Sequence, residues 1–138
     1  MFGKYRHNAD PKGRLFVPAK FREELGEAFY VTPSPDGCLL VHTQESWDKI
    51  LERYNALPFS QAGTLRAFFA NAAKCEPDKQ GRFLLPAELR SYAHLGQEVI
   101  FVGQAGHAEI WDSAAYDEME AKTLTPEYLA AAMEALGF

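Results

Sequence analysis

The chain has no long hydrophobic run and few residues of the kinds that build redox sites. No apolar stretch approaches the roughly 18 residues of a membrane-spanning helix. The opening MFGKYRH contains no apolar leader core, so we expect no signal peptide. Cys38 and Cys75 are the only cysteines, and they lie 37 residues apart without C-x-x-C spacing. We expect two buried, reduced thiols in a cytoplasmic protein, with a disulfide as the alternative.

Signatures of catalysis are also lacking. The sequence contains no P-loop and no G-x-G-x-x-G. Asp36, His42 and Ser46 could be named as a triad, but no nucleophile elbow surrounds the serine. The four histidines show no metal-ligand spacing with one another or with the cysteines. We therefore expect no enzyme, no metal, no cofactor and no small-molecule substrate.

The charge is unevenly distributed along the chain. The net charge is −5, yet residues 1–22 alone carry six basic side chains against Asp10. Residues 91–138 carry eight acidic side chains against Lys122. A basic head suits a nucleic-acid partner, whereas ordinary solvated surface explains the asymmetry equally well.

The strongest pattern in the sequence is an internal repeat. Residues 10–22 read DPKGRLFVPAKFR and residues 78–90 read DKQGRFLLPAELR, with six identities over 13 positions. Four further pairs exchange one apolar residue for another. The echo continues downstream, where Trp47-Asp48 corresponds to Tyr116-Asp117. The chain therefore contains two copies of one unit.

Each copy predicts the same order of elements. The residues 10–13 favour a type I turn, followed by a short strand over 14–17 whose expected partner is a strand over 5–9. Pro18 and Pro86 suit the first turn of a short helix, and Gly26 suits the end of the first one. Further strands are expected over 28–32 and 38–42 in the first copy and over 82–85, 98–102 and 108–111 in the second.

Three more segments have helical spacing. Apolar residues at i, i+3, i+4 and i+7 predict helices over 46–56 and 60–73. Thr125-Pro126 is a good N-cap and first-turn pair for a last helix. These apolar stripes favour core and subunit packing over a cofactor groove.

The repeated D-x-x-G-R…P…R pattern resembles the MraZ family, within the wider AbrB/SpoVT group. The likeness covers roughly residues 1–120, from Met1-Phe2 to Glu109-Ile110-Trp111-Asp112. It implies an α+β, β-rich fold in which two interleaved swapped-hairpin units form a pseudo-dimeric barrel with packing helices. The expected domains are 4–47 and 74–118, with linking helices over 48–73 and a C-terminal helical tail over 119–138.

The resemblance also implies a function. Proteins of this family are cytoplasmic, nucleoid-associated repressors that form homo-oligomeric rings. They bind double-stranded DNA at short G-rich direct repeats upstream of the division and cell-wall gene cluster, including their own gene. We accordingly expect a sequence-specific DNA-binding transcriptional regulator without a membrane partner.

The residues of the motif are compatible with such a role. An arginine after a tight glycine turn can bond guanine O6 and N7 together. The resemblance implies that Arg14 is the principal base reader and Arg82 its counterpart in the second copy. The residues expected to hold phosphates are Lys12, Lys4, Lys20 and Lys79. The residues expected to shape the two motifs are Asp10, Gly13, Pro18, Arg22, Asp78, Gly81, Pro86 and Arg90. Lys12 and Lys20 become Gln80 and Glu88 in the second copy, so the first should be the stronger electrostatic partner.

Two alternatives remain open. Each motif arginine could simply pair with the aspartate of its own turn, while Arg22 and Arg90 brace the helices that carry them. The whole chain could also be an oligomeric interaction or scaffold protein without DNA binding, whose acidic C-terminal half binds a basic partner.

Overall fold

The computed structural model describes residues 1–138, and it has a mixed α+β fold in which the order of elements repeats. The first half contains β1 (Lys4–Asn8), β2 (Arg14–Phe16), α1 (Ala19–Leu25), β3 (Phe29–Pro33), β4 (Leu39–His42), α2 (Gln44–Asn55), α3 (Phe59–Ala62), η1 (Gly63–Leu65) and α4 (Arg66–Ala70). The second half contains β5 (Ala73–Cys75), β6 (Arg82–Leu84), α5 (Ala87–Tyr92), β7 (Glu98–Gln104), β8 (His107–Asp112), α6 (Ser113–Thr123) and α7 (Pro126–Leu136).

The two halves are interlaced through their strands. A six-stranded sheet has the order β1-β7-β8-β4-β3-β5, and its neighbouring strands are antiparallel. Each edge strand therefore pairs with the hairpin of the other half, β1 with β7 and β5 with β3. The remaining strands, β2 and β6, form a separate two-stranded antiparallel ribbon, to which each half contributes one strand.

The expected pairing of residues 5–9 with 14–17 is wrong. Strand β1 pairs instead with β7 over five residues, from Lys4 opposite Val102 to Asn8 opposite Glu98. Strand β2 has only three residues, so a long ladder was not available to β1 there. One hydrogen bond to a side chain joins the two segments: the Phe16 N–H donates to His7 Nε2 at 3.1 Å.

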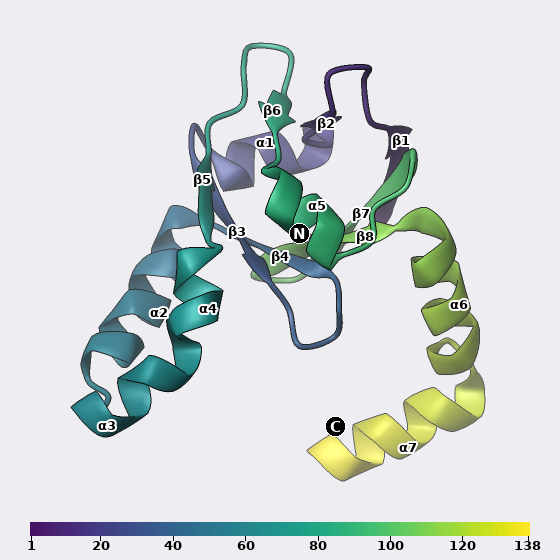
Figure 1. The fold of residues 1–138 in the computed structure, drawn as a ribbon. Helices are drawn as coiled ribbons and strands as arrows, with labels where there is room; N and C mark the ends of the chain where they lie inside the picture. The colour runs from purple at the N-terminus through teal and green to yellow at the C-terminus, as the bar shows by residue number, and fades with distance from the viewer.

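The ribbon and the short helices α1 and α5 cover one face of the sheet (Figure 1). The main core lies beneath them and includes Leu15 and Phe83 from the ribbon and Phe21 and Leu89 from the two helices. Phe83 meets the sheet residue Phe29 edge to face at 5.1 Å between ring centroids. Apolar burial thus fixes the ribbon in place through alternate residues, and its other residues face outward.

The expected helix over 60–73 is wrong as one continuous helix. Most of it lies in the first helical leg, residues 44–70. That segment is divided into α3, η1 and α4, and strand β5 begins at Ala73. Gly63 interrupts the helix near its middle, and the buried Cys75 opposite Phe29 draws the chain into the sheet. The leg packs through aromatic pairs, including Trp47 stacked on Tyr30 at 4.9 Å and Phe69 against Tyr54 at 4.3 Å.

The second helical leg, residues 113–136, consists of α6 and α7. Thr125 caps α7 by accepting a hydrogen bond from the Tyr128 N–H, and Pro126 lies in its first turn, as expected. Figure 1 shows the two legs extending away from the ribbon, on opposite sides of the sheet's lower end. None of the helices combines the length and the apolar character that a membrane span requires.

Candidate nucleic-acid interface

Two nearly identical turns stand at the end of the molecule opposite the legs (Figure 1). In the first turn, residues 10–14, the Oδ1 atom of Asp10 accepts the N–H groups of Lys12 at 3.0 Å and Arg14 at 2.8 Å. Gly13 has φ +77°, a conformation that favours glycine. The second turn, residues 78–82, repeats this geometry with Asp78 and with Gly81 at φ +82°. Each aspartate thus accepts two backbone N–H groups of its own turn.

These hydrogen bonds keep the two aspartates ionised. Burial opposes ionisation of Asp10, but the bonds from the Arg14 backbone and side chain outweigh it and lower its pKa. For Asp78 the backbone N–H of Arg82 is the main cause of a lowered pKa. Each turn therefore presents a fixed carboxylate to its own arginine.

Each motif arginine uses only part of its guanidinium within the chain. Arg14 donates from Nε to Asp10 Oδ2 at 2.6 Å, and Arg82 donates from Nε to Asp78 Oδ2 at 2.7 Å. The Arg14 and Arg82 side chains are 28% and 31% exposed, and their terminal nitrogens have no partner in the structure. The pairing of each arginine with the aspartate of its own turn is therefore present. It orients the guanidinium and leaves the terminal nitrogens without a partner.

The ribbon places the two arginines on one face. Arg14 lies opposite Leu84, and Arg82 lies opposite Phe16, so the arginines are diagonal neighbours. Their Cα atoms are therefore separated by roughly 7–8 Å. Because side chains alternate along a strand, both point away from the face that buries Leu15 and Phe83.

The two turns are braced reciprocally by arginines from the opposite copy. Arg22, on α1, donates from Nε to Val17 O at 3.2 Å and from Nη2 to Gln80 O at 2.9 Å, which places it against the second turn. Arg90, on α5, lies against the first turn, where a Cβ on Gly13 would be 2.6 Å from its Nη1 atom. The Arg90 Nε atom is buried and has no hydrogen-bond partner. Each of these arginines therefore lies against the turn of the other copy.

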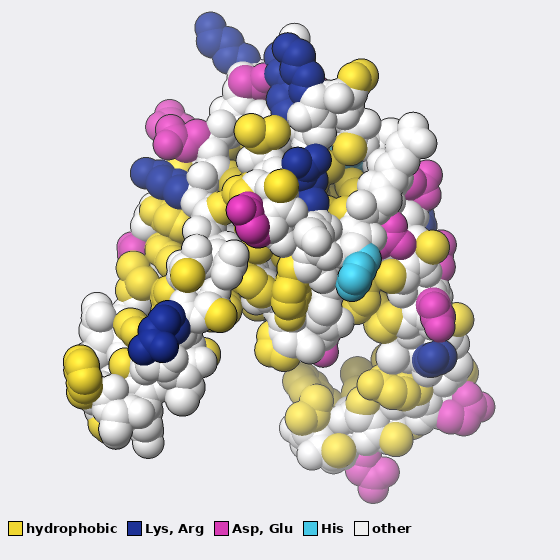
Figure 2. Space-filling view, viewed as in Figure 1, with side chains coloured by type: hydrophobic (Ala, Val, Ile, Leu, Met, Phe, Trp, Pro, Cys, Tyr) yellow, Lys and Arg dark blue, Asp and Glu magenta, His cyan; other side chains and the backbone are white.

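Three of the four expected phosphate-binding lysines are free of ion pairs. Lys12 and Lys79 are exposed on the two turns, and Lys20 is exposed on α1 beside Pro18. In the view of Figure 2, basic side chains stand over the β5–β6 turn at the upper end of the molecule. The ribbon, its turns and their flanks thus form a basic surface.

Lys4 lies elsewhere. Its amine bonds to Glu120 on α6, and the neighbouring strand residue Arg6 bonds to Asp117 at 2.6 Å. The acidic second half therefore neutralises part of the basic N-terminal segment. Both residues belong to the basic N-terminal segment of the sequence, and no local pattern predicts these pairs, which join positions more than 100 apart.

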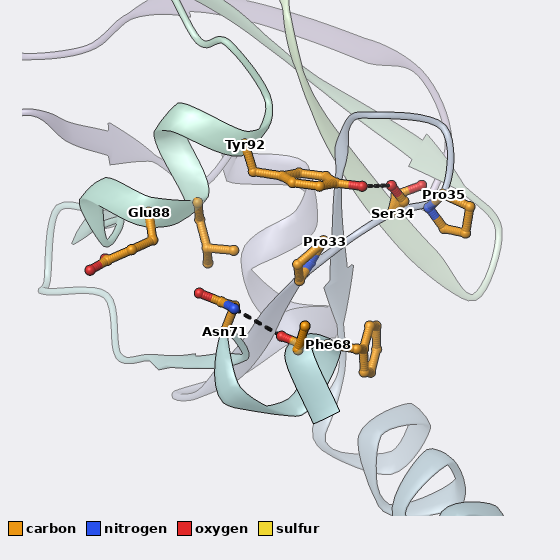
Figure 3. A pocket seen from close by; sticks show the side chains of 9 residues that line it. Pro33, Ser34, Pro35, Phe68, Asn71, Glu88 and Tyr92 are labelled. Carbon is orange, nitrogen blue, oxygen red and sulfur yellow. Dashed lines mark hydrogen bonds between the residues drawn. The ribbon is translucent and has the colours of Figure 1, made fainter. Parts of the chain in front are cut away.

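Outside this basic surface, few groups could bind a metal or a ligand. No group of three or more His, Cys, Asp or Glu residues could hold a metal ion. Both cysteines are buried and unpaired, as expected, and burial raises the pKa of each thiol to about 12. A pocket of about 380 Å³ lies between α4, α5 and the β3–β4 turn (Figure 3). Its Tyr92 hydroxyl donates to Ser34 O, and its Asn71 amide donates to Ala67 O, so these polar groups are already bonded within the chain.

Interlaced halves that each supply one Asp-x-x-Gly-Arg turn to a shared ribbon define an α+β protein built from a duplicated unit. The chain belongs to the MraZ family: the family model described as "MraZ protein, putative antitoxin-like" matches residues 1–66 and 68–136. The two matches follow the duplication that the sequence shows.

Proteins named "Transcriptional regulator MraZ" are similar to the chain over most of its length. The one from Heliobacterium modesticaldum is 44% identical over 99% of the chain and 96% of the relative. The one from Carboxydothermus hydrogenoformans is 48% identical over 87% of the chain and 94% of the relative. The one from Desulfitobacterium hafniense is 49% identical over 81% of the chain and 80% of the relative. The family is one of regulators and not of enzymes, which agrees with the expected lack of catalysis.

Proposed function

We propose that the chain is a sequence-specific DNA-binding transcriptional regulator and that the ribbon is its reading surface. The observation that carries this proposal is the pair of oriented arginine forks, Arg14 and Arg82, on one outward face. Each aspartate holds Nε and leaves the terminal nitrogens without a partner, so little side-chain entropy is lost when the fork meets a guanine. Each good bidentate contact contributes roughly 1–3 kcal/mol of discrimination.

The lysines around the ribbon supply affinity rather than sequence preference. Lys12, Lys20 and Lys79 neutralise phosphates and set the register of the ribbon on the duplex. Lys4 can join them only by leaving Glu120, so its contribution is smaller. Two turns of this size offer too few contacts for tight specific binding at cellular salt. Several protomers must therefore act on one operator.

The target that fits this arrangement is a set of short G-rich direct repeats in the chain's own promoter, within the division and cell-wall gene cluster. A head-to-tail ring presents its ribbons in the same sense, which matches direct repeats spaced at about 10 base pairs. We infer a repressor that acts in the cytoplasm and associates with the nucleoid. The similarity to named transcriptional regulators supports the class of function, and the free arginine forks support the kind of contact.

The architecture that we infer for this function is a pseudo-dimeric barrel of two swapped-hairpin units. Its units span 4–47 and 74–118, with helical segments over 48–73 and 119–138. The cross-paired edge strands and the shared ribbon support this arrangement. A scaffold protein that binds a basic partner through its acidic half has less support, because Asp117 and Glu120 already pair with basic residues of their own chain.

The direct test is selection of duplexes from a random pool, followed by shift assays at several salt concentrations. We expect enrichment of G-containing boxes in direct repeat, with affinity that falls steeply as salt rises. Failure to bind any duplex at low salt would overturn the proposal.

A further inference from the structure

The C-terminal helix α7 is apolar and lacks a covering partner. None of its residues is buried, and Leu129, Met133 and Leu136 are 42%, 53% and 75% exposed. These three residues follow i, i+4, i+7 spacing and so share one face. An 11-residue helix is too short to be stable by itself in water, where about 12–15 residues are marginal. The helix therefore needs a surface to pack against.

The charge of α7 has one sign. Between Pro126 and Phe138 the only charged side chains are Glu127 and Glu134. A matching surface should therefore be an apolar groove with a basic edge.

The first helical leg has such a groove. A hollow of about 480 Å³ opens between the outer face of β4 and the helices α2 and α4. Its apolar walls include Leu40, Ile50, Leu57, Leu65, Phe68 and Phe69, and the exposed parts of Leu57 and Leu65 are 37% and 40%. Arg53 is the only Lys or Arg in the lining, and no carboxylate lines it. An amphipathic helix in an apolar groove is a common mode of recognition.

The occupant of the groove is not the chain's own helix. Figures 1 and 2 show α7 on the second leg, clear of the first leg that carries the groove. In the first half of the chain, α4 turns back and packs against α2, whereas α7 ends the second half without returning to the sheet. The duplication thus leaves one unfilled groove and one bare helix in each protomer.

We propose that α7 of one protomer lies in the groove of a second copy of this chain, with its glutamates near Arg53. The helix and the groove are different surfaces, so the contact is heterologous and propagates head to tail. This inference rests on the proposed assembly and names the surfaces that build it.

Complementary variants test this contact without DNA. The helix variant carries Leu129→Glu and Met133→Glu, and the groove variant carries Leu57→Glu and Leu65→Glu. All four side chains are exposed in the single chain, so neither variant should disturb the fold of the protomer. Phe59→Glu is the matched control, because Phe59 is 98% exposed on the same leg but does not line the groove.

Mass in solution is the readout, by analytical ultracentrifugation. We expect the wild type and Phe59→Glu to form a multi-protomer species and each double variant to be monomeric. An equimolar mixture of the two double variants should form a heterodimer, because one intact helix and one intact groove remain. A monomeric wild type, an unchanged mass in either double variant, or a mixture that stays monomeric would overturn the inference. Each of these results would leave the binding of a protomer to a single DNA box unaffected, so the proposed function would stand. A loss of DNA binding while the assembly stays intact would instead count against the proposed function and not against this contact.

Discussion

Arg22 and Gly81 come from opposite copies of the repeat, and the arginine lies flat against the glycine of the second turn. A Cβ on Gly81 would be 2.6 Å from Nη2 and 2.7 Å from Cζ of Arg22. The reciprocal contact joins Arg90 and Gly13. Each turn is thus held by the helix that follows the other strand of the ribbon, and the two motif arginines are positioned as a unit.

Gly81→Ala tests this brace. The positive φ of Gly81 should cost an alanine roughly 1–2 kcal/mol of stability, and displacement of Arg22 should add to that loss. Gly37→Ala is the matched control, since Gly37 has φ +83° but open space around it. Urea unfolding should show the larger loss for Gly81→Ala, and only this variant should weaken binding to the selected duplex. Equal effects of the two variants on stability and binding would contradict the brace.

The aspartates of the turns should make the ribbon sensitive to acid. Their pKa values lie below the usual 3.8, so the stability that the ionised forms provide is present above that pH and is lost as the pH falls below it. Asp10→Asn with Asp78→Asn should remove this part of the pH dependence. Urea midpoints measured from about pH 5 to pH 2.5 provide the comparison. A double variant with the wild-type acid profile would show that the carboxylates do not stabilise the turns.

His42 should add a second pH dependence at a different place in the fold. Its Nε2 atom hydrogen-bonds the buried Thr32 hydroxyl at 2.8 Å. Burial, with a smaller effect of His107, lowers the pKa of His42 from 6.5 to about 4. Stability should therefore fall as the pH drops from about 6.5 towards 4, with a slope of about 1.4 kcal/mol per pH unit from this group. His42→Gln should flatten that slope in urea unfolding, and an unchanged slope would assign the effect to another group.

The lysines differ in how freely they can reach phosphate. Lys12→Ala should lower the slope of log affinity against log salt by about 1, because an exposed amine without an ion pair is removed. Lys4→Ala should lower it less, since Glu120 already holds that amine. Shift assays on one duplex over a salt series measure both slopes. Equal losses for the two variants would place Lys4 on the phosphates as fully as Lys12.

The local elements could be predicted from sequence, but not how they pair. Asp10, Gly13 and Pro18 predict a turn, a strand and a helix start because turn geometry and proline constraints depend on adjacent residues. The pairing of β1 with β7 depends on which strand offers a ladder after the chain has collapsed. Strand β5 was hidden by the helical spacing that extends from Leu65 to Ala72, because three residues carry too little alternation to compete with it.

In the candidate site, too, contacts between nearby residues could be predicted from the sequence, whereas contacts between distant residues could not. The motif arginines and their aspartates are close in sequence, so their arrangement could be inferred from the turn. The hydrogen bond from Arg22 to Gln80 O joins residues 58 positions apart, and no local sequence pattern predicts it. The salt bridge between Lys4 and Glu120 is likewise set by the fold, which lays β1 beside the second leg.

The most direct test of the account is the sequence preference of Arg14→Lys and Arg82→Lys. Lysine keeps the charge but lacks the planar fork, so non-specific affinity should persist while base reading is lost. The measurement is the ratio of affinities for the selected duplex and a scrambled duplex of equal length, at one salt concentration. We expect Arg14→Lys to lower this ratio by about 5- to 150-fold per box, the equivalent of roughly 1–3 kcal/mol, and Arg82→Lys to lower it as well. Wild-type ratios in both variants would show that the ribbon arginines do not read DNA.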